Sequence, residues 1–297
     1  SHLLPPQGDF LLPIQPPGPE KLQPPRRAER AMAGQQVFLP SDAARPCGSY
    51  DVVYVSPHLD DVAFSCAGHI AKQRREGRRV LVVTVFSRGD PARCMNAYSD
   101  YAPRFAEDVE CMRLLGVDWY YADFEEMVFR SGTADKSRCL DLRLTMAFLA
   151  GWLCAPSDLR ARLAACLEGV VRKTGATWLL GPAGMGFHPD HLLVHRACHQ
   201  MKRKLPAVRV SFYHDWAYCL FAVLRAPRLW APSLRGLRTE ELRVEGDDME
   251  LKKQAIKVYK TQVAPLLGSG DLLKGERVAD AWLEGDPHER FLDDDAA

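Results

Sequence analysis

The continuous apolar run at residues 78–87, RRVLVVTVFS, most limits what this chain can fold into. It is rich in β-branched residues and lacks polar alternation, which is typical of a strand covered on both faces of a sheet. Similar short runs lie at 49–56, 117–124, 176–182 and 207–216. Helical patterns lie between or after them, at 62–75, 102–116, 142–156, 157–175, 188–205 and 249–263. Strands that alternate with helices predict an α/β fold, here a Rossmann-like α/β/α sandwich with a mostly parallel sheet and a single catalytic domain.

Residues 1–48 differ from this pattern. They hold ten of the 21 prolines and show little hydrophobic periodicity. Such a segment cannot bury enough apolar surface to fold alone, so we expect a Pro-rich flexible N-terminal tail, followed by a catalytic domain over 49–297. A partner-binding proline motif is the alternative, and Met32 is a candidate start of the functional chain.

Composition narrows the class of protein. The formal net charge is +1, which provides no global field to attract nucleic acid. No apolar run reaches the length of a membrane span, and we expect no signal peptide. Nine cysteines without a Cys-x-x-Cys pair predict reduced thiols and a cytoplasmic location. Nothing in the sequence decides the oligomeric state, so a homo-oligomer stays open.

Polar or glycine-containing segments follow four of the predicted strands. They are PHLDD at 57–61, SRGD at 87–90, GMGFHPDH at 184–191 and YHDW at 213–216. In α/β folds ligands bind beyond the carboxyl ends of parallel strands. We therefore expect these segments to converge on one crevice.

The first and third segments carry the residue types of a metal site. His58 and Asp61 are three positions apart, so on a helical turn they share a face and can bind one ion, while Asp60 stays free to contact water. His188 and His191 repeat that spacing and offer the third ligand that catalytic zinc usually needs. Two histidines and a carboxylate suit Zn²⁺, with Fe²⁺ as the chemical alternative.

Plainer interpretations exist for the same residues. Paired aspartates after a strand can cap a helix. His191, His195 and His199 recur every four residues, so a pair of them could chelate a metal, although His195 and His199 are also consistent with an ordinary helix face.

The segments SPHLDD and GFHPDH resemble the two metal motifs of the PIG-L (LmbE-like) zinc N-deacetylases. The similarity extends to about residue 291 through an R-x-x-E…LGV helix, an A-x-x-x-Y-x-x-Q helix and a terminal E-x-F element. Their positions here are Arg104, Glu107, 115–117, Ala255, Tyr259, Gln262, Glu289 and Phe291.

Carried over by position, the resemblance implies one zinc ion per chain bound by His58, Asp61 and His191. Asp60 is then the general base for the zinc-bound water. His188 polarises the amide oxygen or protonates the leaving amine, and Asp190 orients a histidine.

The resemblance implies hydrolysis of the N-acetyl amide of an N-acetylglucosamine-type sugar on a small molecule or glycoconjugate. Two alternatives are an amidase that cleaves a larger acyl or thiol-conjugate amide, and a non-catalytic carbohydrate-binding relative. Leu59 stands where the family usually has proline, and Val62 where glutamate is common. The HLDD form followed by FSCAG is similar to the branch that contains glycopeptide-antibiotic deacetylases.

Five further residues are candidate substrate contacts. For Arg104 the alternative role is an ion pair with Glu107 or Asp108 on its own helix. For His214 and Trp216, at the end of the last predicted strand, the alternative is loop packing. The five are Arg88, Asp90, Arg104, His214 and Trp216.

Overall fold

The computed structural model describes residues 48–89, 100–130, 157–216 and 236–293. Within these ranges the strands are β1 (Val52–Ser56), β2 (Val80–Thr84), β3 (Asp118–Tyr121), β4 (Trp178–Pro182), β5 (Arg209–Tyr213), β6 (Arg238–Arg243) and β7 (His288–Asp293). The helices are α1 (Asp61–Arg75), α2 (Tyr101–Leu115), α3 (Met127–Arg130), α5 (Ser157–Thr174), the 3-10 turn η5 (Met185–Phe187), α6 (Pro189–Lys204), α8 (Asp247–Val258), α9 (Lys260–Leu267) and α10 (Leu272–Gly285).

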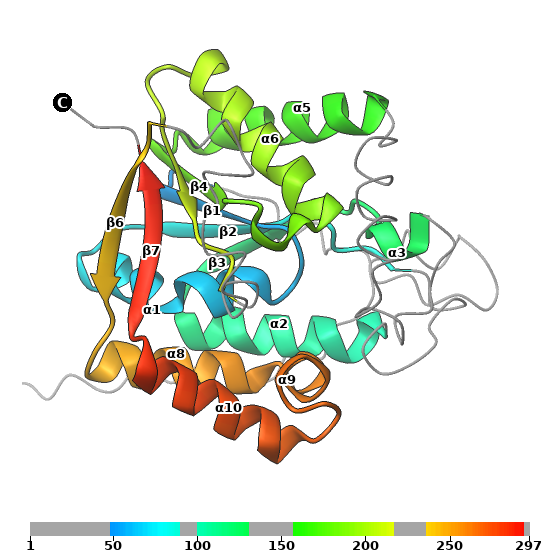
Figure 1. Cartoon of the computed structure of the whole chain (residues 1–297). Helices are drawn as coiled ribbons and strands as arrows, with labels where there is room; N and C mark the ends of the chain where they lie inside the picture. Colours follow the sequence, from blue (N-terminus) through cyan, green and yellow to red (C-terminus); the bar gives the residue numbers. More distant parts are fainter. Residues whose placement is uncertain (1–47, 90–99, 131–156, 217–235, 294–297) are drawn as a thin grey trace, which may run out of the picture.

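The strands form one mixed sheet in the order β3-β2-β1-β4-β5-β7-β6. The five strands from β3 to β5 are parallel, whereas β7 runs antiparallel to both β5 and β6. Helices α5 and α6 cover one face of the sheet, and α1, α2 and α8 cover the other (Figure 1). This arrangement confirms the predicted α/β sandwich with a mostly parallel sheet.

Strand β1 shows why its sequence has no polar alternation. Val53 and Val55 lie in the core beneath α5 and α6, and Val52 and Tyr54 lie in the core on the opposite face. All five residues of the strand are buried. A strand in the middle of a two-sided sheet needs apolar side chains on both faces, as the sequence predicted.

The chain reverses direction across the sheet between β1 and β4. From β1 it proceeds outward to β2 and β3, and from β4 it proceeds the other way to β5. The loops after β1 and β4 therefore diverge above a switch point, which is where ligands bind in such sheets. The two predicted metal motifs directly follow these two strands.

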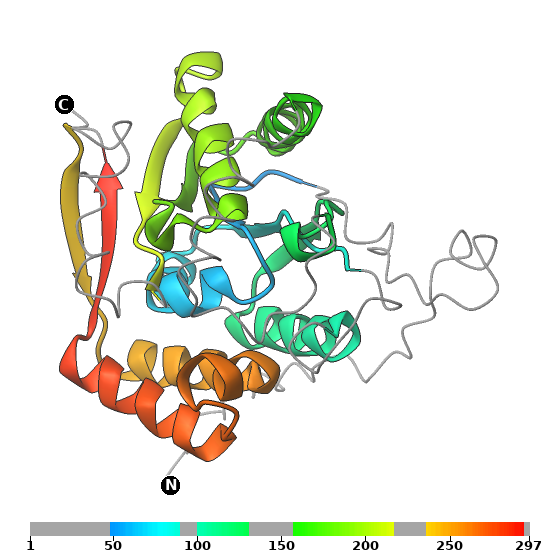
Figure 2. The same cartoon turned by 45° about the vertical axis from the view of Figure 1, so that its right-hand side comes forward.

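The C-terminal part departs from the sequence prediction. The single helix expected over 249–263 is wrong, because the helix breaks at Tyr259 (φ −83°, ψ 61°) into α8 and α9. This break places the Tyr259 hydroxyl 2.7 Å from Asp108 of α2. Helix α10 and the antiparallel pair β6 and β7 were not anticipated; Figure 2 shows this pair at the edge of the sheet. The helix expected at 142–156 and the N-terminal tail lie outside the described residues.

Two further expectations concern thiols and membranes. The four cysteines within the described ranges, Cys66, Cys111, Cys166 and Cys198, are free thiols. Among the residues that the structure describes, no helix has the length and apolar character that a membrane span requires.

Candidate metal centre

The turn after β1 brings His58 and Asp61 together. The Ser56 hydroxyl donates to the His58 carbonyl (2.6 Å) and accepts from the Val62 amide (3.2 Å), which closes the turn at both ends. Inside it, the His58 backbone N–H donates to Asp61 Oδ2 (2.8 Å). Asp60 occupies the N-cap position of α1, but its side chain makes no capping hydrogen bond. The helix-capping interpretation therefore does not describe Asp60.

The second motif lies at the start of α6. Pro189 occupies the first helical position, where a missing N–H costs nothing, and His188 is the N-cap residue. Gly184 and Gly186, both at φ 79°, adopt the left-handed backbone that lets the loop turn back from β4. His191, one turn into the helix, is fully buried.

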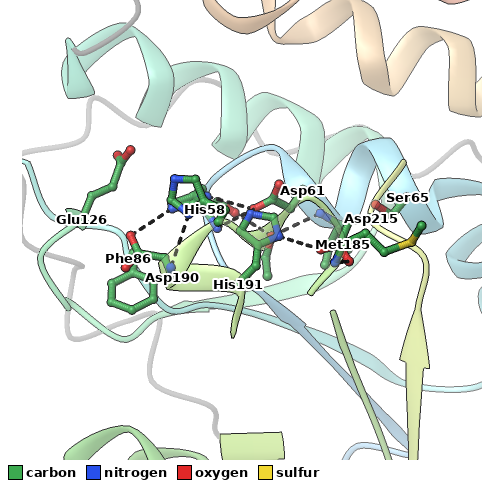
Figure 3. Close-up of polar contacts among 12 residues, drawn as sticks. His58, Asp61, Ser65, Phe86, Glu126, Met185, Asp190, His191 and Asp215 are labelled. Atoms are coloured by element: carbon green, nitrogen blue, oxygen red, sulfur yellow. Dashed lines mark hydrogen bonds and ion pairs between the residues drawn. The ribbon is translucent and has the colours of Figure 1, made fainter. Parts of the chain in front are cut away.

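Donor atoms of three side chains converge on one point. Asp61 Oδ2 lies 3.1 Å from His58 Nδ1 and 3.2 Å from His191 Nε2. Figure 3 shows these three side chains grouped between β1 and α6, with Asp190 and Asp215 on opposite sides of the group. His188 is close to the same group, since it shares with His58 and His191 a set of donor atoms within 4.8 Å of one another.

A carboxylate fixes the outer nitrogen of each histidine. Asp190 Oδ2 accepts from His58 Nε2 (3.2 Å), and Asp215 Oδ1 accepts from His191 Nδ1 (2.6 Å). Metal-bound histidines typically donate their second ring N–H to such an acceptor, which directs the other nitrogen to the metal. The two histidines thus present opposite nitrogens, Nδ1 and Nε2, to the same point.

This donor set fits a zinc ion. Zinc bonds of about 2.0–2.1 Å in tetrahedral geometry put neighbouring ligand atoms a little over 3 Å apart, which matches the separations around Asp61 Oδ2. Two imidazoles and one carboxylate leave the fourth position open. The chemistry and spacing of these donors are therefore compatible with a metal site of the catalytic type.

The charges of the cluster are strongly coupled. Burial lowers the pKa of His58, yet hydrogen bonds to Asp190 and Asp61 outweigh it and raise that pKa to about 9. Burial also lowers the pKa of His191, but the charges and hydrogen bonds of Asp61 and Asp215 outweigh burial and raise this pKa well above its ordinary value. Burial raises the pKa of Asp61, but His191 and His58 hold it well below its ordinary range. The cluster thus attracts positive charge, and protons and metal compete for the same nitrogens.

The pKa shifts of Asp60 and His188 favour the uncharged form of each side chain, unlike those of the three residues above. Burial and the adjacent Asp61 raise the pKa of Asp60 to about 6, against the opposing charge of Arg104. Burial and the nearby His58 lower the pKa of His188 to about 3. His188 Nδ1 accepts from the Asp190 backbone N–H (3.3 Å), so a neutral His188 carries its proton on Nε2.

Arg104 of α2 and Arg88 of the loop after β2, two of the candidate substrate contacts, both form ion pairs. Arg104 is buried and donates to Glu126 (3.0 Å), a residue of the loop before α3 and neither of the two expected helix partners. Arg88 is partly exposed, and its guanidinium lies 3.5 Å from the Asp123 carboxylate. Asp90 lies outside the described residues.

His214 and Trp216 lie beyond β5, on either side of Asp215. Both line a cavity of about 260 Å³. Its other lining residues are Ser65, Trp282, Asp286, His288, Glu289 and Arg290. The Trp216 backbone N–H also donates to the Ser65 hydroxyl (3.1 Å), which ties the loop after β5 to the second turn of α1.

Several residues singled out by the sequence have packing roles. Leu59 packs against Tyr101, Tyr121 and Phe129 in a small apolar cluster, and Val62 lies in the core under α1. Leu59 and Val62, the two residues that differ from the usual family motif, are therefore buried apolar side chains. His195 is buried, with its Nδ1 3.0 Å from the Pro182 carbonyl oxygen and its ring centre 4.5 Å from that of Phe212, which is a packing role on α6.

Sequence reasoning placed Asp215 among the residues of YHDW that line the pocket or pack the loop, but it did not predict that Asp215 orients a histidine. It gave that role to Asp190 alone. The available signal for Asp215 was its position in YHDW, directly after a parallel strand, where the other site residues also lie.

A parallel sheet with a two-histidine, one-carboxylate cluster at its switch point is the arrangement expected of a metal-dependent α/β hydrolase. Residues 53–202, about half of the chain, match the PIG-L family, described as GlcNAc-PI de-N-acetylase. The chain belongs to the PIG-L family, which confirms the resemblance seen in the motifs.

The family's relatives agree with the predicted enzyme class, a hydrolytic N-deacetylase. The chain is 33% identical to a 2'-N-acetylparomamine deacetylase of Streptomyces fradiae over 156 residues, which are 48% of this chain and 49% of that protein. The match thus spans about half the length of this curated relative.

Solved structures show the same fold. A deacetylase of the teicoplanin pathway superposes with a TM-score of 0.61 at 22% identity, over 83% of this chain and all of the other. The A40926 pseudoaglycone deacetylase gives a TM-score of 0.58 at 21% identity, over 82% and 96%. A zinc-inhibited form of the teicoplanin deacetylase Orf2 gives a TM-score of 0.59 at 21% identity, over 83% and 100%.

Proposed function

We propose that this protein is a zinc-dependent hydrolase that removes the acetyl group from the amide of an N-acetylated amino sugar. The observation that carries the proposal is the convergence of His58 Nδ1, Asp61 Oδ2 and His191 Nε2, at 3.1 and 3.2 Å around the carboxylate oxygen. The outer nitrogen of each histidine meets a buried carboxylate, as at metal-binding histidines.

Zinc bound there would act as a Lewis acid that polarises the amide carbonyl and makes water more acidic. We assign Asp60 as the base that accepts the proton of the attacking water. It lies next to a ligand, has no capping role, and has a pKa of about 6 because of burial and Asp61. A base of this strength is ionised at neutral pH and still holds a proton well enough to return it to the leaving amine.

His188 serves better as a hydrogen-bond donor than as an acid. Its pKa of about 3, a result of burial and the neighbouring His58, leaves the imidazole neutral at pH 7. Its Nδ1 faces the Asp190 amide, so the Nε2–H is the group available to the amide oxygen. A donor aimed at the oxygen where negative charge develops stabilises the tetrahedral state. We therefore assign His188 to the oxyanion and not to the amine.

We infer that the substrate is an N-acetylglucosamine-type unit of an antibiotic or a related glycoconjugate. Support comes from the relatives named above, one a paromamine deacetylase and others deacetylases of glycopeptide pathways. A direct test is release of acetate from 2'-N-acetylparomamine, an N-acetylglucosaminyl glycopeptide pseudoaglycone and free N-acetylglucosamine. Failure on all three at any metal loading would contradict the substrate class.

The division of labour between the two aspartates provides the test of the mechanism. D60N should lose turnover by several orders of magnitude while zinc content stays near one per chain. D61N should lose the zinc itself. If both variants kept zinc, or both lost it, the assigned roles would be wrong.

Metal identity needs its own measurement. The metal-stripped chain is reconstituted with one equivalent of Zn²⁺, Co²⁺, Fe²⁺ or Mn²⁺, and turnover is compared at equal occupancy. Zinc is added stoichiometrically, because the teicoplanin deacetylase Orf2 has a zinc-inhibited form. A chain that binds no zinc and gains no activity from it would refute the proposed function.

A further inference from the structure

The short helix α3 packs directly on the carboxylate that orients His58. Asp190 is fully buried, and its Oδ2 accepts from both His58 Nε2 (3.2 Å) and the Met127 backbone N–H (2.9 Å). Its other oxygen, Oδ1, accepts from Arg130 Nη2 (2.5 Å). Both ends of α3 thus donate to one carboxylate that lies 60 residues further along the chain.

The Arg130 guanidinium is itself held in place. A second nitrogen, Nη1, donates to the Glu125 carbonyl, and the guanidinium carbon lies 4.9 Å from the centre of the Phe86 ring. Phe86 also lies beside His58, with ring centres 6.1 Å apart. Arg130 therefore contacts the loop after β2, the loop before α3 and Asp190 at the same time.

A carboxylate with a fixed orientation fixes the imidazole that donates to it. A buried aspartate can rotate about its side-chain bonds unless donors occupy both of its oxygens. Arg130 occupies Oδ1, so Oδ2 stays aligned with His58 Nε2, and His58 Nδ1 stays aligned with Asp61. Outer partners of this kind affect metal affinity because they determine the ring orientation and basicity of the ligand.

We propose that Arg130 is a positioning residue for the metal centre, acting on His58 through Asp190. The inference rests on the proposed zinc site but goes beyond it, since Arg130 belongs to neither metal motif and touches no ligand. The guanidinium can donate to Asp190 and to the Glu125 carbonyl at once, whereas a lysine ammonium cannot reproduce this planar two-sided contact.

The experiment compares R130Q and R130K with the wild type. Arg162 provides the matched control, because its guanidinium also lies over a phenylalanine ring, Phe124 at 5.4 Å, on the exposed side of α5. Zinc affinity of the metal-stripped full chain is measured by competition with a chromophoric chelator. The absorption spectrum of the Co²⁺ form reports the ligand geometry, and thermal unfolding of the metal-free chain reports the fold.

R130Q should weaken zinc binding on the order of tenfold, the lower end of the range for outer partners, and should alter the Co²⁺ spectrum. R130K should restore part of the affinity, and R162Q should match the wild type in both readouts. Equal affinity and equal spectra for R130Q, R130K and wild type would overturn the inference. If R130Q does not fold, R130K and R162K are compared instead by zinc affinity and by the Co²⁺ spectrum. Equal values for these two variants would then overturn the inference. A wild-type chain that binds no zinc would instead overturn the metal site itself.

Discussion

His58 and His191 bind their carboxylate partners through different ring nitrogens. His191 donates from Nδ1 to Asp215, whose second oxygen accepts from the Met185 backbone N–H (2.9 Å). Asp215 is therefore fixed from two sides, as Asp190 is. A carboxylate held in this way sets both the tautomer and the ring angle of the histidine that it contacts.

D215N should weaken zinc binding by about 10–100-fold, because the amide carries no charge and presents only one acceptor oxygen to its two donors. Chelator competition on the full chain measures the effect. D280N, the same change at a carboxylate of α10 whose Oδ2 contacts Lys257 of α8 (2.7 Å), is the control. Unchanged affinity in D215N would show that Asp215 serves the loop after β5 rather than the metal.

His69 makes a second prediction at the scale of one residue. Burial lowers its pKa to about 3 in the folded chain, in contacts with the Tyr54 hydroxyl (2.8 Å) and the Phe291 ring (4.5 Å). An unfolded histidine titrates near 6.5, so protons bind preferentially to the unfolded state below that pH. His69 thus supports stability above pH 6.5, and this contribution is lost as the pH falls toward 3.

The share of His69 in the loss of unfolding free energy from pH 7 to pH 5 should be roughly 2 kcal/mol. In H69Q this part of the pH dependence should disappear, because glutamine does not titrate. Urea unfolding of both chains at pH 7, 6 and 5 gives the two slopes. Parallel slopes would contradict the assignment to His69.

These residues also show what the sequence could and could not predict. His58, Asp61 and His191 were predicted because each belongs to a short motif behind a strand. Asp215 lies behind β5 in YHDW, which has no metal-motif spacing, and Arg130 lies in none of the predicted site segments. They reach the site only through the packing of β5 and α3 against it, which no local spacing encodes.

At the scale of elements, a buried ion pair of the C-terminal half also contacts helix α1. Lys252 of α8 contacts Glu289 of β7 (2.6 Å), and both side chains are almost fully buried. Glu289 also accepts from the Gly68 and His69 backbone N–H groups of α1 (2.9 and 2.7 Å). One carboxylate therefore holds α1, α8 and β7 together.

K252M should lower the unfolding free energy by about 3–5 kcal/mol, because it leaves the Glu289 charge buried without its cation. The double variant K252M/E289Q should recover much of that loss, since a neutral amide needs no counter-ion. Urea unfolding of the two single variants, the double variant and wild type gives the coupling energy. Additive losses would show that the two side chains do not depend on each other.

The strands that the sequence predicted most directly are ones that the fold buries on both faces. Strands β1 and β2 are covered on both faces, and their apolar runs identified them directly. Strand β6, with sequence RTEELR, is mostly exposed and carries no apolar pattern. Its place in the sheet depends on pairing with β7, a long-range contact that a local pattern does not contain.

At the scale of the whole molecule, the proposed metal site joins two halves of the sheet. Asp61 and His58 belong to the half that continues from β1 to β2 and β3, and His191 belongs to the half that contains β4 and β5. A metal that binds all three side chains links α1 on one face to α6 on the other. Binding should therefore stabilise the folded chain as a unit, and not only the loops that carry the ligands.

Zinc at about 100 times its Kd should add about 2.7 kcal/mol to the unfolding free energy, if the unfolded chain binds little of it. For a domain of this size, that corresponds to a rise in Tm on the order of 5–10 °C. A calorimetric scan with and without buffered zinc measures the shift. D61N should show none, because an uncharged amide then replaces the carboxylate that contacts both histidines, while D60N should show the full shift, because the proposed role of Asp60 is to accept a proton and not to bind the metal. A zinc-dependent shift in D61N equal to that of wild type would mean that the ion binds elsewhere, and the link between the two halves of the sheet would be lost with it.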